Sequence, residues 1–203
     1  MGNFRLWEED RFIPVLQIGE IPMNTCISYK NGMHKSCLLS CFDANKKVLY
    51  LKIGETTVFR ALLRLTKGSV TEKPIREQKI EFVDLTKEKG RTDPEKEELV
   101  LFLERPYFSK ISAEKENEVV ALVYQMVHEK AKKLQARVVI SRSYAKYEAS
   151  ERYESRQYYM YISASKNGSQ YLDSLGGEAT VSRSGMYGKN VFLMEKEEAE
   201  KAA

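Results

Sequence analysis

Three cysteines and a histidine lie close together in the first part of the chain: Cys26, His34, Cys37 and Cys41. Thiolates and an imidazole are the ligands of tetrahedral zinc sites, so this cluster is the first candidate for chemistry. Residues 36–42 read as a short apolar strand, and on a strand Cys37 and Cys41 lie about 13 Å apart, too far to share one metal ion. We therefore predict that no metal is bound and that the cysteines are small core residues.

A second candidate is a stretch of tyrosines and cations between residues 144 and 171. Aromatic rings beside arginines can stack on nucleic-acid bases and neutralise phosphates, and the same mixture is typical of protein interfaces. Tyrosines can equally line a sheet with their hydroxyl groups in water. All three interpretations stay open, and the residues predicted to contact a partner are Tyr144, Tyr147, Arg152, Tyr153 and Arg156.

The composition indicates a cytoplasmic globular protein with its own core. With 203 residues, 42% of them hydrophobic and 31% charged, the chain has the size and composition of one domain or slightly more. The net charge of +4 is compatible with an acidic partner but falls short of a dedicated nucleic-acid binder. An acidic N-terminus, an odd number of cysteines and the lack of a long apolar run predict no secretion, a reducing compartment and no membrane span.

The first half of the chain predicts an antiparallel meander. It contains three short apolar runs separated by turn sequences, residues 36–42, 47–53 and 57–66. A further strand and a charged surface loop are expected at residues 80–85 and 86–98.

The middle of the chain predicts a β-α-β crossover. Residues 99–104 form a continuous apolar run, which suits a strand buried on both faces. Ser112 is a predicted N-cap for a helix through about Leu134, in which apolar residues recur at helical spacing. Residues 137–142 read as the next strand. Because a long helix separates the two strands, we expect them to pair in parallel.

The last part predicts helices alternating with strands. Residues 143–157 are polar and read as helical, and residues 158–164 read as a strand. Residues 166–175 read as a short helix that Gly176-Gly177 stops, and residues 190–195 as the final strand.

The predicted fold class is mixed α/β (α+β): a central twisted mixed sheet flanked by helices, over residues 36–195. Residues 1–35 are an appended segment, and residues 196–203 a charged tail. Four side chains can pack the appended segment against the domain or mediate an oligomer contact: Trp7, Phe12, Ile13 and Val15.

This order of elements resembles that of the GNAT family, the Gcn5-related N-acetyltransferases, over about residues 36–195. The most specific part is the predicted C-terminal helix, which in that family reads Asn-x-x-Ala-x-x-Phe-Tyr-x-x-Leu-Gly-Phe. Aligned without gaps, Leu175 and Gly176 match, and Tyr171 stands at the aromatic position. Leu172 replaces the tyrosine that often protonates the departing thiolate, and Ser165 replaces the asparagine.

For an active member of the family, the resemblance implies a site for acetyl-CoA. The backbone of the central strand would pair with the pantetheine arm, and nearby cations would meet the phosphates. The implied cofactor-binding residues are Phe102, Leu103, Arg105 and Lys110. The implied catalytic residues are Glu104 as general base and Tyr171 as general acid.

The stretch between the central strand and the long helix departs from the family signature. That signature, Arg/Gln-x-x-Gly-x-Gly/Ala, holds a pyrophosphate on backbone N–H groups, whereas residues 104–118 contain no glycine. Three carboxylates at the helix start would also repel a diphosphate: Glu114, Glu116 and Glu118. We therefore predict a GNAT-like protein that has lost ordinary acetyl-CoA chemistry, needs no cofactor and binds a macromolecular partner, foremost a protein. The alternatives are an active N-acetyltransferase with a diverged cofactor loop and a nucleic-acid-binding protein.

The front half also resembles small proteins of phages and mobile elements, which carry a Gly-Arg-Ala-Leu-like strand after a cysteine. The residues concerned are Cys26-Ile27-Ser28, the strand at 47–53 and Phe59-Arg60-Ala61-Leu62-Leu63-Arg64. This resemblance implies a host-interaction or regulatory role and names no chemistry.

Overall fold

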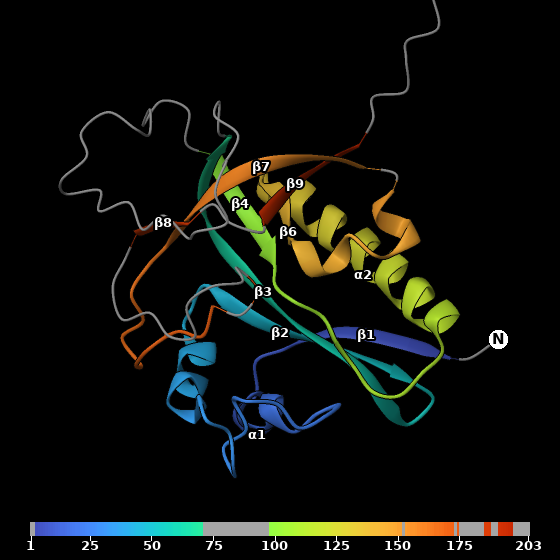
Figure 1. Ribbon diagram of the computed structural model, residues 1–203, viewed down its shortest axis with the longest axis vertical. Coiled ribbons are helices and arrows are strands. Elements are labelled where there is room, and N and C mark those ends of the chain that lie inside the picture. The colour runs from blue at the N-terminus through green and yellow to red at the C-terminus, as the bar shows by residue number, and fades with distance from the viewer. Residues whose placement is uncertain are drawn as a thin grey trace, which may run out of the picture.

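A computed structural model describes residues 3–70, 98–151, 153–172, 174, 185–187 and 191–196 (Figure 1). The strands are β1 (Phe4–Glu9), β2 (Lys46–Ile53), β3 (Thr56–Val70), β4 (Glu98–Leu103), β5 (Tyr107–Phe108), β6 (Arg137–Ser141), β7 (Tyr153–Ile162), β8 (Gly185–Tyr187) and β9 (Val191–Lys196). The α-helices are α1 (Phe12–Leu16) and α2 (Ala113–Leu134). Short 3-10 helices cover Gln17–Gly19 (η1), Lys35–Phe42 (η2), Arg142–Tyr144 (η4) and Glu148–Ser150 (η5).

The described strands form one mixed sheet in the order β1-β2-β3-β4-β6-β9-β7-β8, with β5 beside β3. Strands β2 and β3 are two of the three strands of the predicted meander, and they pair antiparallel as expected. Strand β3 also pairs antiparallel with β4, and β4 pairs in parallel with β6 across the α2 crossover, as predicted. Strand β7 pairs with β9 and also with the C-terminal end of β3, so strands β3, β4, β6, β9 and β7 close on one another. Strands β1 and β2 extend the sheet on the other side of β3. The mixed α/β fold class is therefore confirmed.

Alternation along the central strands separates two faces of the sheet, because successive side chains of a strand point to opposite sides. On one face, Leu49, Leu63 and Leu101 pack against α2 in a single buried apolar cluster. On the other face, Val48 and Tyr50 pack against residues of the N-terminal segment, among them Val15, Ile18 and Leu38. Figure 1 shows α2 on one side of these strands and the α1 and η2 regions on the other.

Helix α2 forms as the apolar spacing predicts. Val119, Val123, Val127 and Ala131 recur every fourth residue and are all buried. The Ser112 hydroxyl accepts a hydrogen bond from the Lys115 backbone N–H at 3.3 Å, which satisfies one donor of the first turn. The prediction of this helix and of its N-cap is confirmed.

Three of the predicted elements are wrong. Residues 35–42 form a 3-10 helix and not a strand, since a short apolar run fits a buried helical turn as well as a strand. Residues 143–157 contain two short 3-10 turns and then strand β7 in place of a helix. Residues 166–172 are not helical: Gly168 has a φ of 120°, and the Gln170 side chain accepts a hydrogen bond from Arg64 of β3.

The remaining expectations divide as follows. The predicted strands at 47–53, 57–66, 99–104, 137–142 and 190–195 correspond to β2, β3, β4, β6 and β9. Residues 80–85, most of the loop at 86–98 and the Gly176-Gly177 stop lie outside the described residues. Residues 4–9, in the predicted appended segment, pair with β2 as strand β1. In the described part of the chain, no helix has the length and apolar character needed to span a bilayer.

Candidate functional site

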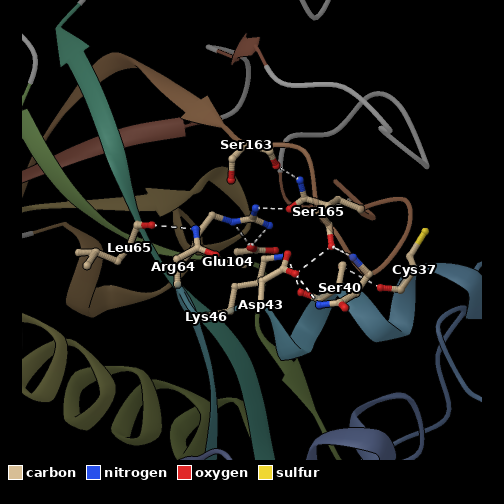
Figure 2. A network of polar contacts seen from close by, with 12 residues as sticks. Cys37, Ser40, Asp43, Lys46, Arg64, Leu65, Glu104, Ser163 and Ser165 are labelled. Atoms are coloured by element: carbon tan, nitrogen blue, oxygen red, sulfur yellow. Dashed lines mark hydrogen bonds and ion pairs between the residues drawn. The ribbon is translucent and has the colours of Figure 1, made fainter.

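The sheet face opposite α2 contains four buried charged residues, Lys46, Arg60, Arg64 and Glu104, and we call it the charged face. Arg64 and Glu104 form a buried ion pair on this face. Arg64 on β3 donates from Nε and Nη2 to Glu104 Oε1, at 2.9 and 2.7 Å (Figure 2). Glu104 directly follows β4, and the side chains of the pair are 2% and 7% exposed. A buried pair of this kind is stable only while both charges are present and hydrogen-bonded.

Residues from the segment after β7 complete the surroundings of this pair. Arg64 Nη1 donates to the Gln170 side-chain oxygen, and the Gln170 amide donates to the Ser163 carbonyl. The Ser174 hydroxyl donates to Glu104 Oε2 at 3.4 Å. All these partners are amide, hydroxyl or carbonyl groups, so they orient the ions without adding charge.

Lys46 forms a second buried cluster on the charged face. Its ammonium group donates to the Ser40 carbonyl at 2.7 Å and to Asp43 Oδ2 at 3.0 Å (Figure 2). Burial is the main reason why the Lys46 pKa is lowered, and repulsion from Arg64 lowers it further. Burial opposes ionisation of Asp43 as well, but hydrogen bonds from Lys46, Ser165 and Asn167 lower its pKa on balance.

Arg60 is the cation on this face that has no carboxylate partner among the described residues. It is 2% exposed, and its Nη2 donates to the Thr25 hydroxyl at 3.0 Å. Its guanidinium carbon lies 3.9 Å from the centre of the Tyr107 ring, a cation–π contact. Its Nε is buried without a hydrogen-bond partner. Burial lowers the Arg60 pKa, since the charged form is deprived of water.

These groups surround a cavity of about 30 Å³. Four cationic side chains and one carboxylate line it, namely Lys46, Arg60, Arg64, Arg105 and Glu104. Glu104 matches Arg64, and Asp43, which is bonded to Lys46, matches Lys46, so Arg60 is the member of the charged face that no carboxylate of the described residues matches. The other lining residues are uncharged or weakly acidic: Ile27, Cys37, Ser40, Cys41, Leu62, Tyr107, Tyr171 and Ser174. The arrangement suits an anionic group and disfavours a cation.

The cysteine cluster does not form a metal site in the described part of the chain, where no three potential ligands gather. Cys37 and Cys41 are buried, as predicted, and Cys26 is partly buried. Burial raises the pKa of Cys41 to about 11, so its thiol stays protonated and unreactive at neutral pH. The His34 ring stacks on Tyr171 at a centroid distance of 4.8 Å.

The structure brings together three of the residues implied by the GNAT resemblance. Glu104, Arg105 and Tyr171 all line the cavity, although the prediction placed Tyr171 on a helix. Lys110 is exposed beyond β5 and does not line it. Phe102 pairs with Arg64 of β3 on one side and Val139 of β6 on the other, and Leu103 likewise pairs with both strands.

The predicted partner surface needs a correction. Tyr144 and Tyr147 are 0% and 4% exposed, because both rings pack in the core beneath α2. A partner at the surface cannot reach them in this fold. Tyr153 and Arg156 lie on β7, paired with Lys196 and Leu193 of β9, and Arg152 lies outside the described residues.

Lys46, Arg60 and Arg64, the cations that define the charged face, were not among the predicted site residues. Arg60 and Arg64 are four residues apart within the apolar run of residues 58–65 of β3, a spacing that places both on one side of the strand. That pattern is a usable signal for paired charges inside a fold, because isolated charges in a buried strand are costly. The contribution of Gln170 and Ser174 depends on contacts across about 70 to 106 residues, which leave no local trace.

The fold and the site define a mixed α/β protein with a charged cavity, and comparison with known proteins does not narrow this class further. No protein-family model, curated protein or solved structure gives a significant match to the chain.

Proposed function

We propose that this is a GNAT-like protein that works by binding a macromolecular partner and has lost ordinary acetyl-CoA chemistry. The strand layout supports the first part of the proposal. An antiparallel β2-β3-β4 unit leads into a parallel β4-α2-β6 crossover, and the last strands β7 and β9 continue the sheet beyond β6. These elements follow one another as in the order on which the resemblance depends, but the strand expected at residues 36–42 is a 3-10 helix and residues 166–172 of the expected C-terminal helix are not helical.

The proposed loss of acetyl-CoA chemistry rests on the hydrogen bonds that already occupy the ends of strands β4 and β6. In an active relative, the resemblance places the pantetheine arm against the backbone of Phe102 and Leu103. Here both edges of β4 are already paired with β3 and β6. Just beyond, the Arg105 N–H donates to the Ser174 hydroxyl at 2.8 Å, and the Ser141 hydroxyl donates to the Ser174 carbonyl at 3.0 Å. Ser174 of the chain itself thus links the two strand ends at the place that a cofactor would need.

The start of α2 is also unfavourable for a diphosphate. The Ser112 hydroxyl occupies the Lys115 N–H, one of the donors that would otherwise bind a phosphate oxygen. Glu114 and Glu116 stand in the first turn, and Glu116 accepts a hydrogen bond from the Tyr147 hydroxyl at 3.0 Å. Their negative charges already complement the helix dipole and repel an anion.

Exposed apolar side chains of the N-terminal segment support a protein as the partner. Six of the eight large hydrophobic residues exposed in the described structure lie between residues 12 and 39. They are Phe12, Ile13, Met23, Tyr29, Met33 and Leu39, of which Met33 is 86% exposed. Side chains of this kind are what protein interfaces bury. This segment takes the place of the tyrosine stretch as the proposed partner surface.

An active acyltransferase is the second candidate, because Glu104, Arg105 and Tyr171 line one cavity. The geometry supports it less well. Glu104 Oε1 already accepts two hydrogen bonds from Arg64, and a general base needs an oxygen within reach of the substrate's proton.

Thermal unfolding with saturating acetyl-CoA separates the two candidates. An enzyme that binds acetyl-CoA at 100 times its dissociation constant gains about 2.7 kcal/mol, or a rise in Tm of about 5–10 °C for a chain of this size. We expect no rise beyond that given by an equal concentration of inorganic phosphate. A larger rise with acetyl-CoA would overturn the proposed loss of chemistry.

A further inference from the structure

We propose that the cavity on the charged face is a binding site for a small oxyanion, a phosphate or carboxylate group, and that Arg60 is its principal ligand. This inference goes beyond the proposed function, since it concerns a buried cavity and not the exposed apolar side chains. The inference also does not depend on whether the protein binds or uses acetyl-CoA.

The unbalanced charge of Arg60 is the first argument. A guanidinium group has five N–H donors and is charged at every physiological pH. Of the described residues, Thr25 accepts from Nη2 and the Tyr107 ring covers one face, while Nε is buried and unbonded. Taking such a charge out of water without a counter-charge costs several kcal/mol. An oxyanion in the cavity supplies both the missing charge and the missing acceptor.

The neighbouring cations are already balanced, which singles out Arg60. Arg64 is paired with Glu104, and Lys46 is paired with Asp43. These pairs stiffen the wall of the cavity and leave little attraction for a ligand. Arg105 also lines the cavity, is exposed, and lies with its guanidinium carbon 5.7 Å from the Tyr107 ring centre. Both guanidinium groups lie near the same aromatic ring, so an anion that enters beside Arg105 comes close to Arg60.

The size of the cavity limits the ligand. A single water molecule needs about 10–15 Å³ on the same measure, so a volume of about 30 Å³ admits a group of only a few heavy atoms. Phosphate and carboxylate carry two oxygens that match the fork of a guanidinium group, whereas a spherical halide ion cannot bind it in this bidentate way. Ser40, Tyr107 and Ser174, which carry hydroxyl groups, are also among the residues that line the cavity. A larger ligand can enter only with its anionic end.

Isothermal titration of the full-length protein with inorganic phosphate tests the proposal, with ionic strength held constant by chloride. The wild type is expected to bind one phosphate saturably. Arg60→Met is expected to weaken binding at least about tenfold, the effect of losing one charge-assisted hydrogen bond in a buried site. The matched control is Lys35→Met, which removes an exposed cation from the η2 helix that carries Cys37 and Ser40, and we expect its affinity to stay within about twofold of the wild type.

Further arms of the experiment distinguish the source of the oxyanion and guard against misfolding. Formate replaces phosphate in a parallel titration, and the tighter of the two identifies a carboxylate or a phosphate as the preferred group. Arg60→Lys keeps the charge but loses the guanidinium fork, so we expect weakened binding even if Arg60→Met fails to fold by circular dichroism. Absence of saturable binding by the wild type, equal binding by the Arg60 variants, or loss of binding in Lys35→Met would overturn the proposal.

Discussion

Strands β2, β3 and β4 use alternate residues to build two faces of different character. On the α2 side, the residues buried against the helix are apolar, among them Leu49, Leu63 and Leu101. On the opposite side, the same strands bury Lys46, Arg60 and Arg64, each at most 5% exposed. Burial of the apolar face can drive folding, because burial of apolar surface is the main favourable contribution to folding. The second face opposes folding unless its charges are matched, so its residues point to a role in binding.

The largest expected effect concerns the buried ion pair. Glu104→Ala leaves the Arg64 guanidinium buried without its counter-charge and should lower the free energy of unfolding by about 3–5 kcal/mol. Urea unfolding measures the change. The double variant Arg64→Met with Glu104→Leu removes both charges and should recover most of the loss. If the double variant is as unstable as Glu104→Ala, the cost does not come from an unpaired charge.

A truncation on the apolar face gives the reference for this comparison. Leu103 is 0% exposed and lies in the cluster beneath α2. Leu103→Ala should destabilise the protein by about 2–4 kcal/mol through lost burial and the cavity left behind. Its cost should be insensitive to salt and pH, because no charge is involved. A loss under about 1 kcal/mol would show that this face is less well packed than the structure indicates.

The edge of the charged face predicts a pH-dependent effect. Arg11 donates to Glu9 from Nε and Nη2, and this interaction lowers the Glu9 pKa from 4.5 to about 2. Since the folded-state pKa is depressed, the stabilisation is complete above about pH 4.5 and is lost as the pH falls towards 2. Glu9→Gln should therefore cost about 1–2 kcal/mol at pH 7, a value reduced by the exposure of Arg11, and nothing near pH 2. Denaturant unfolding from pH 7 to 2 measures it, and a difference that stays constant with pH contradicts the assignment.

The smallest expected change in stability is for substitution of Arg60, in contrast to the large loss expected for Glu104→Ala. In buffer free of phosphate and carboxylates, Arg60→Met removes an unmatched buried charge but also loses the Thr25 hydrogen bond and the Tyr107 contact. Because these losses offset most of the gain, stability should change by only about 0–1 kcal/mol, in the stabilising direction. Adding phosphate should stabilise the wild type and leave the variant unchanged. Chemical unfolding of both proteins, with and without phosphate, provides the check. A destabilisation by more than about 2 kcal/mol without phosphate would assign Arg60 a structural role.

Regular apolar periodicity made the scaffold predictable from the sequence. Valines recur every four residues at Val119, Val123 and Val127, and this spacing specifies helix α2. The continuous apolar run before Glu104 specifies a strand that is buried on both faces. Segment 35–42 was misread because a short apolar run fits a strand and a buried 3-10 helix equally well. The tyrosines at 144 and 147 were misread because burial is decided by distant partners and not by residue type.

The site was less accessible to prediction than the scaffold. Glu104 and Arg105 could be named because they follow a recognisable central strand, and both line the cavity. Their partners come from segments far away in the sequence: Arg64 lies 40 residues before Glu104, and Ser174 lies 70 residues after it. Only the folded chain brings such groups together, so the charge balance of the cavity could not be read from local patterns.

Amide hydrogen exchange at the ends of β4 and β6, measured with and without acetyl-CoA, tests the central claim most directly. The Arg105 N–H donates to Ser174, and the amides of Phe102 and Leu103 lie between two paired strands. We predict slow exchange at these positions in the free protein and no change on adding acetyl-CoA. Fast exchange in the free protein, with protection gained when acetyl-CoA is added, would contradict the closed strand ends and restore the acyltransferase candidate.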